Sequence, residues 1–497
     1  MFLAAFFYLS EQVFRGEEMN AKNITYQRPC PKIEIYNPDN PTKPVLVFDT
    51  TNNRNLLSYQ FTLSTNDISG SFSLTFFPDY ITIGGTNKSL FDDIKKLQIV
   101  KIYEGSEPTA KKTGKGKSSS WNFTYNTKPV FTGIIRNKKY VAQTSDGGGT
   151  RRLSVSGTAI TGLVSQFYIN LDTAAQALTN QIVNDDSINK ELTQKLIGEK
   201  KVKDVINLIW NYFLKISSQN GTPKIADYIT SFMGGTSVFL DVDNTEFDYP
   251  IASVFRGQQT QDFFDIIDGL IPQPVYEKFA YMDYKTGKMK IKIRLSPFDA
   301  DKWTGLNSHT LEARKIKSFD LTESDDEVYT VFYAYLNGYP IDEQKSLVLS
   351  TMKVQKDLTV VDTSKYTTYG YRPLIAHFLG YGTKDGEKDD SSTSKITETT
   401  KKLASWYENL PDMLKGSISL AMTYEDGFIQ PGEIIKFLGG EFYVNGITHN
   451  WNYGSGGEIN LNVSRGALYT SGKFSNSISN LTSLIKLLQN GIDAESK

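Results

Sequence analysis

The chain has 497 residues, enough for about three domains of ordinary size. Its 54 Lys and Arg residues against 55 Asp and Glu leave a net charge of −1. A clamp that holds nucleic acid by overall charge is therefore excluded, whereas a local basic patch stays open. Cys30 is the single cysteine, which excludes a disulfide scaffold and a multi-thiolate metal centre. These totals favour a structural or binding role over catalysis.

Residues 1–30 are predicted to be an N-terminal extension. The apolar run Met1–Leu9 is too short to span a bilayer core, which takes about 20 residues. Met19 is a natural start, and residues 16–18 (Gly-Glu-Glu) are what a purine-rich ribosome-binding site looks like when translated. We therefore expect residues 1–18 to be a start-site artefact, and no other stretch predicts stable insertion into a membrane.

Residues 31–160 are predicted to form antiparallel strands, because β-branched and aromatic residues alternate with polar ones between turn residues. A segment rich in Lys, Gly and Ser at 106–128 predicts a long exposed loop between two of these strands. Residues 161–235 are predicted to be helical. Within them, residues 174–196 and the amphipathic stretch Val202–Phe213 have the clearest helical patterns.

The rest of the chain predicts a mixed order of elements. Residues 236–315 read as an α/β region with a short apolar helix at Phe263–Leu270 and a hairpin at Tyr276–Leu295 that turns at Lys285–Gly287. The following ranges are predicted to be strands of a second barrel (316–382), a polar linker with a helix (383–411), the rest of that barrel (412–470) and an amphipathic helix (471–497). The predicted fold class is α+β and dominated by β.

An internal repeat is the most informative feature of the sequence. Short glycine-bounded strands predict a small antiparallel barrel in each copy, and four matches in one order favour duplication over chance. Three chains with two like barrels each would place six around an axis, so a trimer could mate with a sixfold ring. The matches are GSFSL (70–74) with GSISL (416–420), IVKIYEG (99–105) with IIKFLGG (434–440), VFTGI (130–134) with YVNGI (443–447), and LSVS (153–156) with LNVS (461–464).

The order of these motifs resembles one family. GSFSLTFFPD, LQIVKIYEG, PVFTGIIRN and RRLSVSGTAITGL, in that order, resemble the N-terminal barrel of tail or baseplate hub proteins. These proteins occur in contractile-tailed phages, phage-tail-like particles and contractile injection systems. The closing segment 430–466 is similar to the C-terminal hub barrel, with His449, Trp451 and an Arg465-Gly466 exit, and Tyr369–Arg372 resembles a further family element.

The resemblance implies a homotrimeric hub ring that joins a hexameric tail tube to a trimeric central spike. It implies contacts with the tube or tube-initiator protein, baseplate wedge proteins and the tape-measure protein, while DNA at most passes through the channel. It implies no cofactor, and a place in a virion or phage-tail-like particle assembled in the bacterial cytoplasm. Two alternatives remain open: a tail-associated peptidoglycan hydrolase, and a surface adhesin or carbohydrate-binding protein.

Two groups of residues are candidate interface residues. Gly116-Lys117-Ser118 imitates the end of a phosphate-binding loop, but Lys111 stands where the first glycine is required and no helix is expected to follow. The lysines of this segment remain candidates for an acidic partner or for passing DNA: Lys111, Lys112, Lys115 and Lys117. On the predicted C-terminal helix, Leu484 and Leu488 are candidates for docking a partner.

Catalytic and metal-binding patterns are weak. Asp241, Asp243 and Asp248 lack the glycine and the terminal glutamate of an EF-hand loop. The acidic pairs Asp299–Asp301 and Asp325–Glu327 are at most distant candidates for the two carboxylates of a glycosidase. The three histidines, far apart in sequence, are His309, His377 and His449, and the last is expected to pack in a barrel or an interface. We therefore expect no catalytic, cofactor or metal site.

Overall fold

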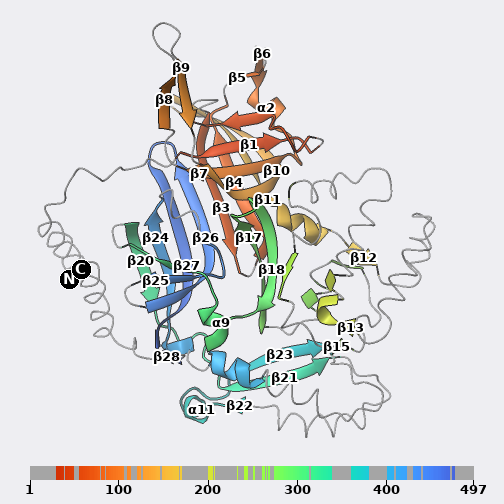
Figure 1. Ribbon diagram of the computed structural model, residues 1–497, viewed down its shortest axis with the longest axis vertical. Helices are drawn as coiled ribbons and strands as arrows, with labels where there is room; N and C mark the ends of the chain where they lie inside the picture. Colours follow the sequence, from red (N-terminus) through yellow and green to blue (C-terminus); the bar gives the residue numbers. More distant parts are fainter. Residues whose placement is uncertain are drawn as a thin grey trace, which may run out of the picture.

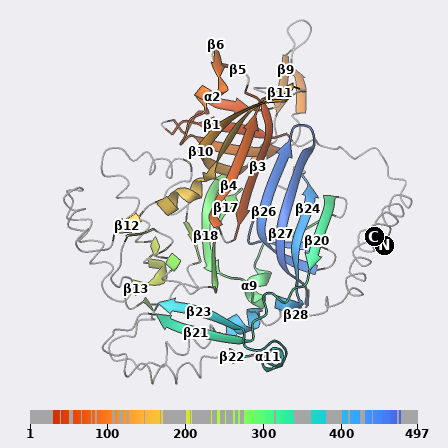
Figure 2. The ribbon, with the colours of Figure 1, turned by 180° about the vertical axis from the view of Figure 1, so that it is seen from behind.

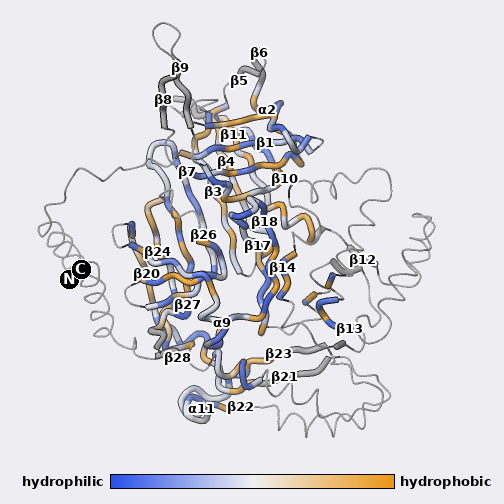
Figure 3. Tube along the Cα trace, in the orientation of Figure 1, coloured by the Kyte–Doolittle hydropathy of each residue, from blue (hydrophilic) through white to orange (hydrophobic). Residues whose placement is uncertain are grey.

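The structure is a computed structural model in which strands dominate (Figure 1). It describes, with short gaps, residues 30–170, 274–337, 360–379 and 400–475, together with parts of 200–268. Its largest element is one 14-stranded sheet. Alternation of apolar and polar residues along these strands places one side of the sheet in the core. The tube coloured by hydropathy shows hydrophobic and hydrophilic residues along the same strands (Figure 3).

The N-terminal half contributes a run of five neighbouring strands. Their order in the sheet is β7 (Ile99–Gly105), β10 (Thr127–Ser145), β11 (Gly148–Ala159), β4 (Asp67–Phe76) and β3 (Leu56–Ser64). Two further strands, β1 (Lys32–Tyr36) and β2 (Leu46–Phe48), extend the sheet beyond β7. We call the five strands the first set.

The C-terminal half contributes a second set in the same order. It consists of β25 (Ile434–Phe437), β26 (Gly440–Asn452), β27 (Gly456–Thr470), β24 (Leu414–Ala421) and β20 (Ile316–Thr322). β19 (Ser308–Thr310) lies parallel to β25, and β28 (Lys473–Ser475) pairs with β27. Each of the four recurring sequence segments lies on strands that hold the same position in the two sets. The predicted repeat is therefore present in the strand order.

The two sets form one continuous sheet, because β3 of the first pairs with β26 of the second. Both views show these strands side by side (Figures 1 and 2). Closure of each set into a barrel of its own stays a prediction.

The two sets also share an irregularity. β10 has a bulge between Ile135 and Asn137, and β26 has one between Val444 and Gly446. The residue before each bulge bonds through both backbone groups to two consecutive residues of the preceding segment. Those residues are Leu97 and Gln98 for Ile135, and Gly432 and Glu433 for Val444. A bulge fixes the local twist of a strand, so Ile135 of β10 is equivalent to Val444 of β26. The predicted match of VFTGI (130–134) with YVNGI (443–447) lies on the correct strands but is shifted by four residues from this equivalence.

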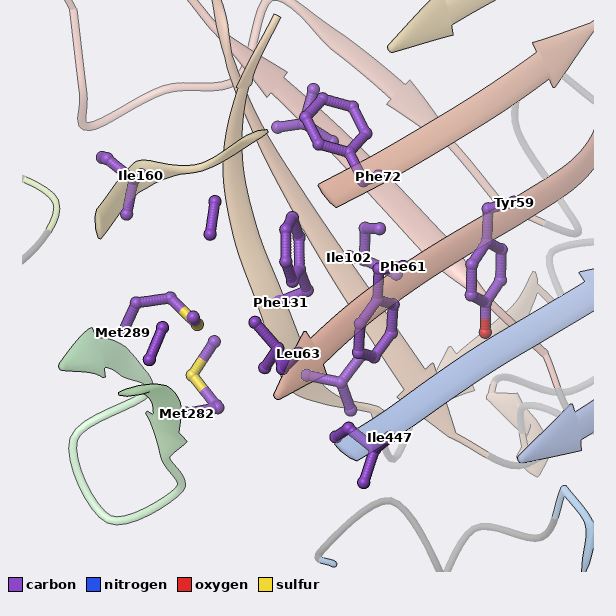
Figure 4. Close-up of a cluster of buried hydrophobic side chains, with 14 of the residues drawn as sticks. Tyr59, Phe61, Leu63, Phe72, Ile102, Phe131, Ile160, Met282, Met289 and Ile447 are labelled. Carbon is purple, nitrogen blue, oxygen red and sulfur yellow. The ribbon is translucent and has the colours of Figure 1, made fainter. Parts of the chain in front are cut away.

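The predicted hairpin at Tyr276–Leu295 is confirmed as β17 (Tyr276–Asp283) and β18 (Lys288–Leu295). Gly287 has a φ of +66°, which suits glycine at the end of the tight turn. The hairpin adds Met282 and Met289 to the main core, which also contains Phe61 and Phe131 (Figure 4). β14 (Leu240–Val242) lies parallel to β18.

Residues 316–382 are predicted to contribute strands to the second barrel. β20 lies in the second set, whereas three other strands of this range do not. β21 (Val331–Asn337), β22 (Val360–Val361) and β23 (Pro373–Leu379) form a separate sheet. A helix, α11 (Thr363–Tyr369), begins within the range expected to be strands because Asp362 caps it by accepting bonds from Ser364 and Lys365. The separate sheet packs on Trp406 and Leu403 of the helical residues 400–407, which the sequence predicts as a helix.

The segment expected as an open loop at 106–128 contains a hairpin of β8 (Thr109–Thr113) and β9 (Ser120–Thr124). The region predicted as helical, 161–235, contains β12 (Tyr168–Asn170) and β13 (Lys200–Lys201), although residues 202–204 and 206–207 are helical. β12 and β13 pair with β16 (Thr260–Asp262) and β15 (Pro250–Ile251). The predicted helices at 174–196 and beyond residue 476 lie outside the described residues.

The remaining described elements are short. They are β5 (Tyr80–Ile83), β6 (Thr86–Ser89), α2 (Leu90–Asp93), α9 (Ala300–Thr304) and two 3₁₀ turns at Ile160–Gln166 and Leu410–Asp412.

Candidate assembly interface

The strand pair that joins the two sets is the feature around which the candidate interface is built. β3 residues 58–64 run antiparallel to β26 residues 446–452, with Phe61 opposite His449 and Thr62 opposite Thr448. We call this pairing the seam. Further backbone bonds extend it at both ends, from Thr65 N to the Asn445 carbonyl and from Tyr453 N to the Leu57 carbonyl.

A buried polar cluster locks the core side of the seam. His449 Nδ1 donates to both carboxylate oxygens of Glu104 at 2.8 and 3.0 Å, because an ionised carboxylate only accepts. The Tyr59 hydroxyl donates to the same carboxylate at 2.8 Å, and the His449 ring stacks on Phe61 with centroids 4.4 Å apart. The cluster thus connects β7 and β3 of the first set with β26 of the second.

Burial sets the electrostatics of this cluster. His449 is 1% exposed and Glu104 is 6% exposed. Burial, together with the neighbouring Glu104 charge, raises the pKa of Tyr59 well above its usual value of 10. Tyr59 therefore stays a neutral donor to the Glu104 carboxylate, and the cluster ties β7 and β3 to β26.

The opposite side of the seam is polar. A shallow groove of about 450 Å³ lies across β3, β26, β27, β24 and β20. Its lining combines hydroxyl and amide side chains with Ile447 and Leu461, and Asp320 is its one charged residue; the polar residues include Thr62, Thr448, Ser417, Asn460 and Asn462. Thr62 and Thr448 are hydrogen-bonded to each other through their hydroxyls at 3.1 Å. The lining therefore carries little charge.

A second buried network fixes the hairpin of β17 and β18 to the second set. Arg294 Nε lies 2.6 Å from Glu277, and the Tyr443 hydroxyl donates to the same carboxylate at 2.6 Å. Arg294 also donates to the Gly432 carbonyl at 2.7 Å, next to the segment that holds the bulge of β26. Burial raises the pKa of Tyr443 well above its usual value, so this hydroxyl also remains a donor.

Arg465 ends the regular part of β27 in an unusual conformation. Its φ is +55°, and its guanidinium donates to the Trp406 carbonyl and lies on the rings of Phe298 and Tyr407. Burial lowers its pKa to about 10. This residue of the Arg-Gly exit therefore holds the 400–407 helix against the second set.

The structure describes the candidate interface residues only in part. Lys111 and Lys112 lie on β8, at the tip of the molecule that carries the β8–β9 hairpin (Figure 1). Lys115, Lys117, Leu484 and Leu488 lie outside the described residues. Their roles as contact residues stay predictions.

The acidic candidates have structural contacts where they are described. Asp241 accepts from the Tyr281 hydroxyl and pairs with Lys292, and Asp243 pairs with Lys302. Asp299 caps α9 by accepting from the Lys302 backbone at 2.8 Å. Within the described part of the chain, no group of three or more His, Cys, Asp or Glu side chains is placed to hold a metal ion.

Sequence reasoning found His449 but missed its partners. The expectation that His449 packs in a barrel or interface agrees with its burial at the seam. Glu104 was missed, although it follows Val100 and Ile102 at period two on the buried face of β7. An acidic residue in phase with buried apolar ones requires a buried partner, and that pattern could have identified it.

Tail proteins are among the solved structures to which this chain is similar. A tail protein from Neisseria meningitidis MC58 aligns with a TM-score of 0.45 and 11% identity over 87% of this chain and 96% of its own. The 43 kDa tail protein of prophage MuSo2 from Shewanella oneidensis aligns at 0.43 and 12%, over 88% and 97%. The E. coli c3393 protein, a component of the type VI secretion system, aligns at 0.37 and 10%, over 85% and 75%.

No protein-family model and no curated protein matches the sequence. Among the described residues, no helix is both long and apolar enough to cross a membrane.

Proposed function

We propose that this chain is a structural subunit of a tail or baseplate hub. Three copies form a pseudo-sixfold ring that joins a hexameric tail tube to a trimeric central spike. The observation that carries the proposal is the presence of two strand sets with one order in one sheet. A chain built in this way supplies two similar surfaces, so a threefold assembly can offer six of them to a sixfold partner.

The polar groove supports a position beside a channel. Because Ser, Thr and Asn side chains stay hydrated and carry no charge, such a wall lets DNA or another cargo pass without holding it. In this arrangement the core side of the sheet, with the hairpin of β17 and β18, faces away from the axis. The separate sheet of β21 to β23 and the helix α11 then lie on the outer parts of the ring, where contacts with spike or wedge proteins are expected.

The proposed role is non-catalytic, and extensive contacts between subunits carry it. Obligate assemblies of this kind bury more than about 2,000 Å² at each interface. The tail tube or tube-initiator protein, the spike, the wedge proteins and the tape-measure protein are the expected partners, in a virion or a phage-tail-like particle.

Deletion of the gene in cells that produce the particle tests the proposal. We expect electron microscopy to show no complete tails after deletion. Quantitative mass spectrometry of wild-type particles should find three copies of this chain per tail. The purified chain should release no fragments from peptidoglycan. The proposal would be contradicted if particles were normal after deletion or if particles lacked the chain. It would also be contradicted if the purified chain cleaved peptidoglycan and a matched preparation without the chain did not.

A further inference from the structure

Several strand edges of the large sheet have no strand partner among the described residues, and two of them, on β20 and β10, correspond to the strands of the seam. β20 pairs with β24 on one side only. β10 pairs with β11 along its length, but β7 covers its other side only as far as Ile134, so residues 137–145 leave that edge open. Open edges are templates for pairing with another chain.

The first open edge corresponds to one strand of the seam. β20 holds the position in the second set that β3 holds in the first. Both strands carry Phe-x-Leu with the apolar residues toward the core, as Phe61–Leu63 in β3 and Phe319–Leu321 in β20. The glycine at 70 lies against the Thr62 carbonyl, as the glycine at 416 lies against the Asp320 carbonyl. Thr62 and Asp320 are therefore counterparts.

The second open edge corresponds to the other strand of the seam. The shared bulge makes Ile135 the counterpart of Val444. Counting onward from it, Lys139 is the counterpart of Thr448 and Tyr140 that of His449. β3 and β26 pair with each other within the chain. Their counterparts, β20 and β10, do not pair with each other.

We propose that β20 of one copy pairs antiparallel with β10 of the next copy and so forms a second seam between chains. This inference rests on the trimeric ring of the proposed function and specifies its contact. Transfer of the register of the seam places Asp320 opposite Lys139, as Thr62 lies opposite Thr448. It places Phe319 opposite Tyr140, as Phe61 lies opposite His449.

Burial supports a partner at these edges. Tyr140 is 45% exposed, whereas its counterpart His449 is 1% exposed. Phe61 is 1% exposed, whereas Phe319 is only partly buried at the margin of the core. The seam inside the chain covers one aromatic pair. In a single copy the equivalent residues are only partly covered, since Tyr140 meets Phe91 edge-to-face and Phe319 meets Phe437 edge-to-face. Pairing of the two edges would bury both Tyr140 and Phe319.

The charges of the two edges are complementary. Lys139 and Asp320 are both exposed, and neither has an ion-pair partner among the described residues. Lys138 precedes Lys139 on β10, while β20 leads into an acidic run that contains Glu323, Asp325 and Asp326. Charges on open edges discourage pairing with unrelated strands, and opposite charges across the proposed seam select the correct partner.

A disulfide between chains tests the register. Asn450 lies opposite Gln60 in the seam, and the equivalent pair between copies is Val141 with Ser318. The full-length variant with Val141→Cys and Ser318→Cys is produced in the native host, and its particles are oxidised and run on a non-reducing gel. We expect linked dimers and trimers, with the trimer as the largest species because a ring of three is closed. The matched variant with Gln60→Cys and Asn450→Cys should link within one chain.

The outcomes separate this inference from the proposed function. Linked trimers support the seam, provided that the single variants Val141→Cys and Ser318→Cys give none. A second outcome is that particles hold three copies of the chain and the Gln60–Asn450 pair links, but the Val141–Ser318 pair does not. This outcome overturns the seam between chains and leaves the hub role standing. Absence of the chain from particles overturns both.

Discussion

At the scale of single residues, a buried hydrogen-bonded pair specifies how the two halves of the chain meet. Glu104 is provided by the first strand set and His449 by the second, and both are almost fully buried. Such a pair adds little net stability compared with apolar residues, but loss of one member leaves the other uncompensated. The pair therefore makes the correct seam register strongly preferred over a shifted one.

Replacement of His449 measures this contribution. We expect His449→Ala to lower the free energy of unfolding by about 3 kcal/mol, because it leaves the Glu104 carboxylate with Tyr59 as its remaining donor and removes a stacked ring. The control is His309→Ala, which removes a histidine bonded to Glu433 at 2.8 Å with a side chain 30% exposed. That change should cost less than about 1 kcal/mol. Denaturant unfolding of both variants checks the difference, and equal losses would contradict the assigned role.

At the scale of elements, the sequence predicts strands well and their partners poorly. The hairpin of β17 and β18 follows from alternation and a turn glycine, both of which are local. The sequence did not predict the helix α11, which is short and is marked mainly by its capping residue Asp362. It did not predict the hairpin of β8 and β9 either, because a strand rich in Lys and Ser has weak hydrophobic periodicity. The repeat predicted two similar modules, but no local pattern could show that β3 would pair with β26, some 390 residues further along the chain.

The edge strand β20 packs closely on β24 only because residue 416 of β24 is a glycine. A Cβ at Gly416 would lie 1.9 Å from the Asp320 carbonyl oxygen, and the residue has a φ of +154°. Gly416→Ala should therefore push β20 away from β24 and destabilise the chain by roughly 2 kcal/mol. Gly454→Ala is the matched control, since nothing lies within 4 Å of its Cβ position. Thermal unfolding should separate the two variants, and coincident transitions would show that β20 tolerates the displacement.

At the scale of the whole molecule, assembly depends on where charges lie rather than on their sum. With a net charge of −1, copies neither repel nor attract each other strongly at long range. Lys138 and Lys139 of β10 and the acidic run after β20 instead give each copy one edge of each sign. A head-to-tail contact between such edges closes into a ring when the rotation between copies is one third of a turn.

A charge exchange across the proposed seam tests this view in solution. Lys139→Asp and Asp320→Lys each place like charges opposite one another, at a cost of about 1 kcal/mol per seam. Because a ring has three seams, each single variant should dissociate at a concentration at least about tenfold higher than the wild type. The double variant restores opposite charges and should regain most of the lost affinity, which a double-mutant cycle quantifies.

The control is Lys436→Asp, which changes the net charge by as much as Lys139→Asp does. Lys436 pairs with Glu441 away from both open edges, so this variant should dissociate as the wild type does. Mass photometry over a dilution series gives the values, and additive losses in the double variant would mean that Lys139 and Asp320 do not face each other.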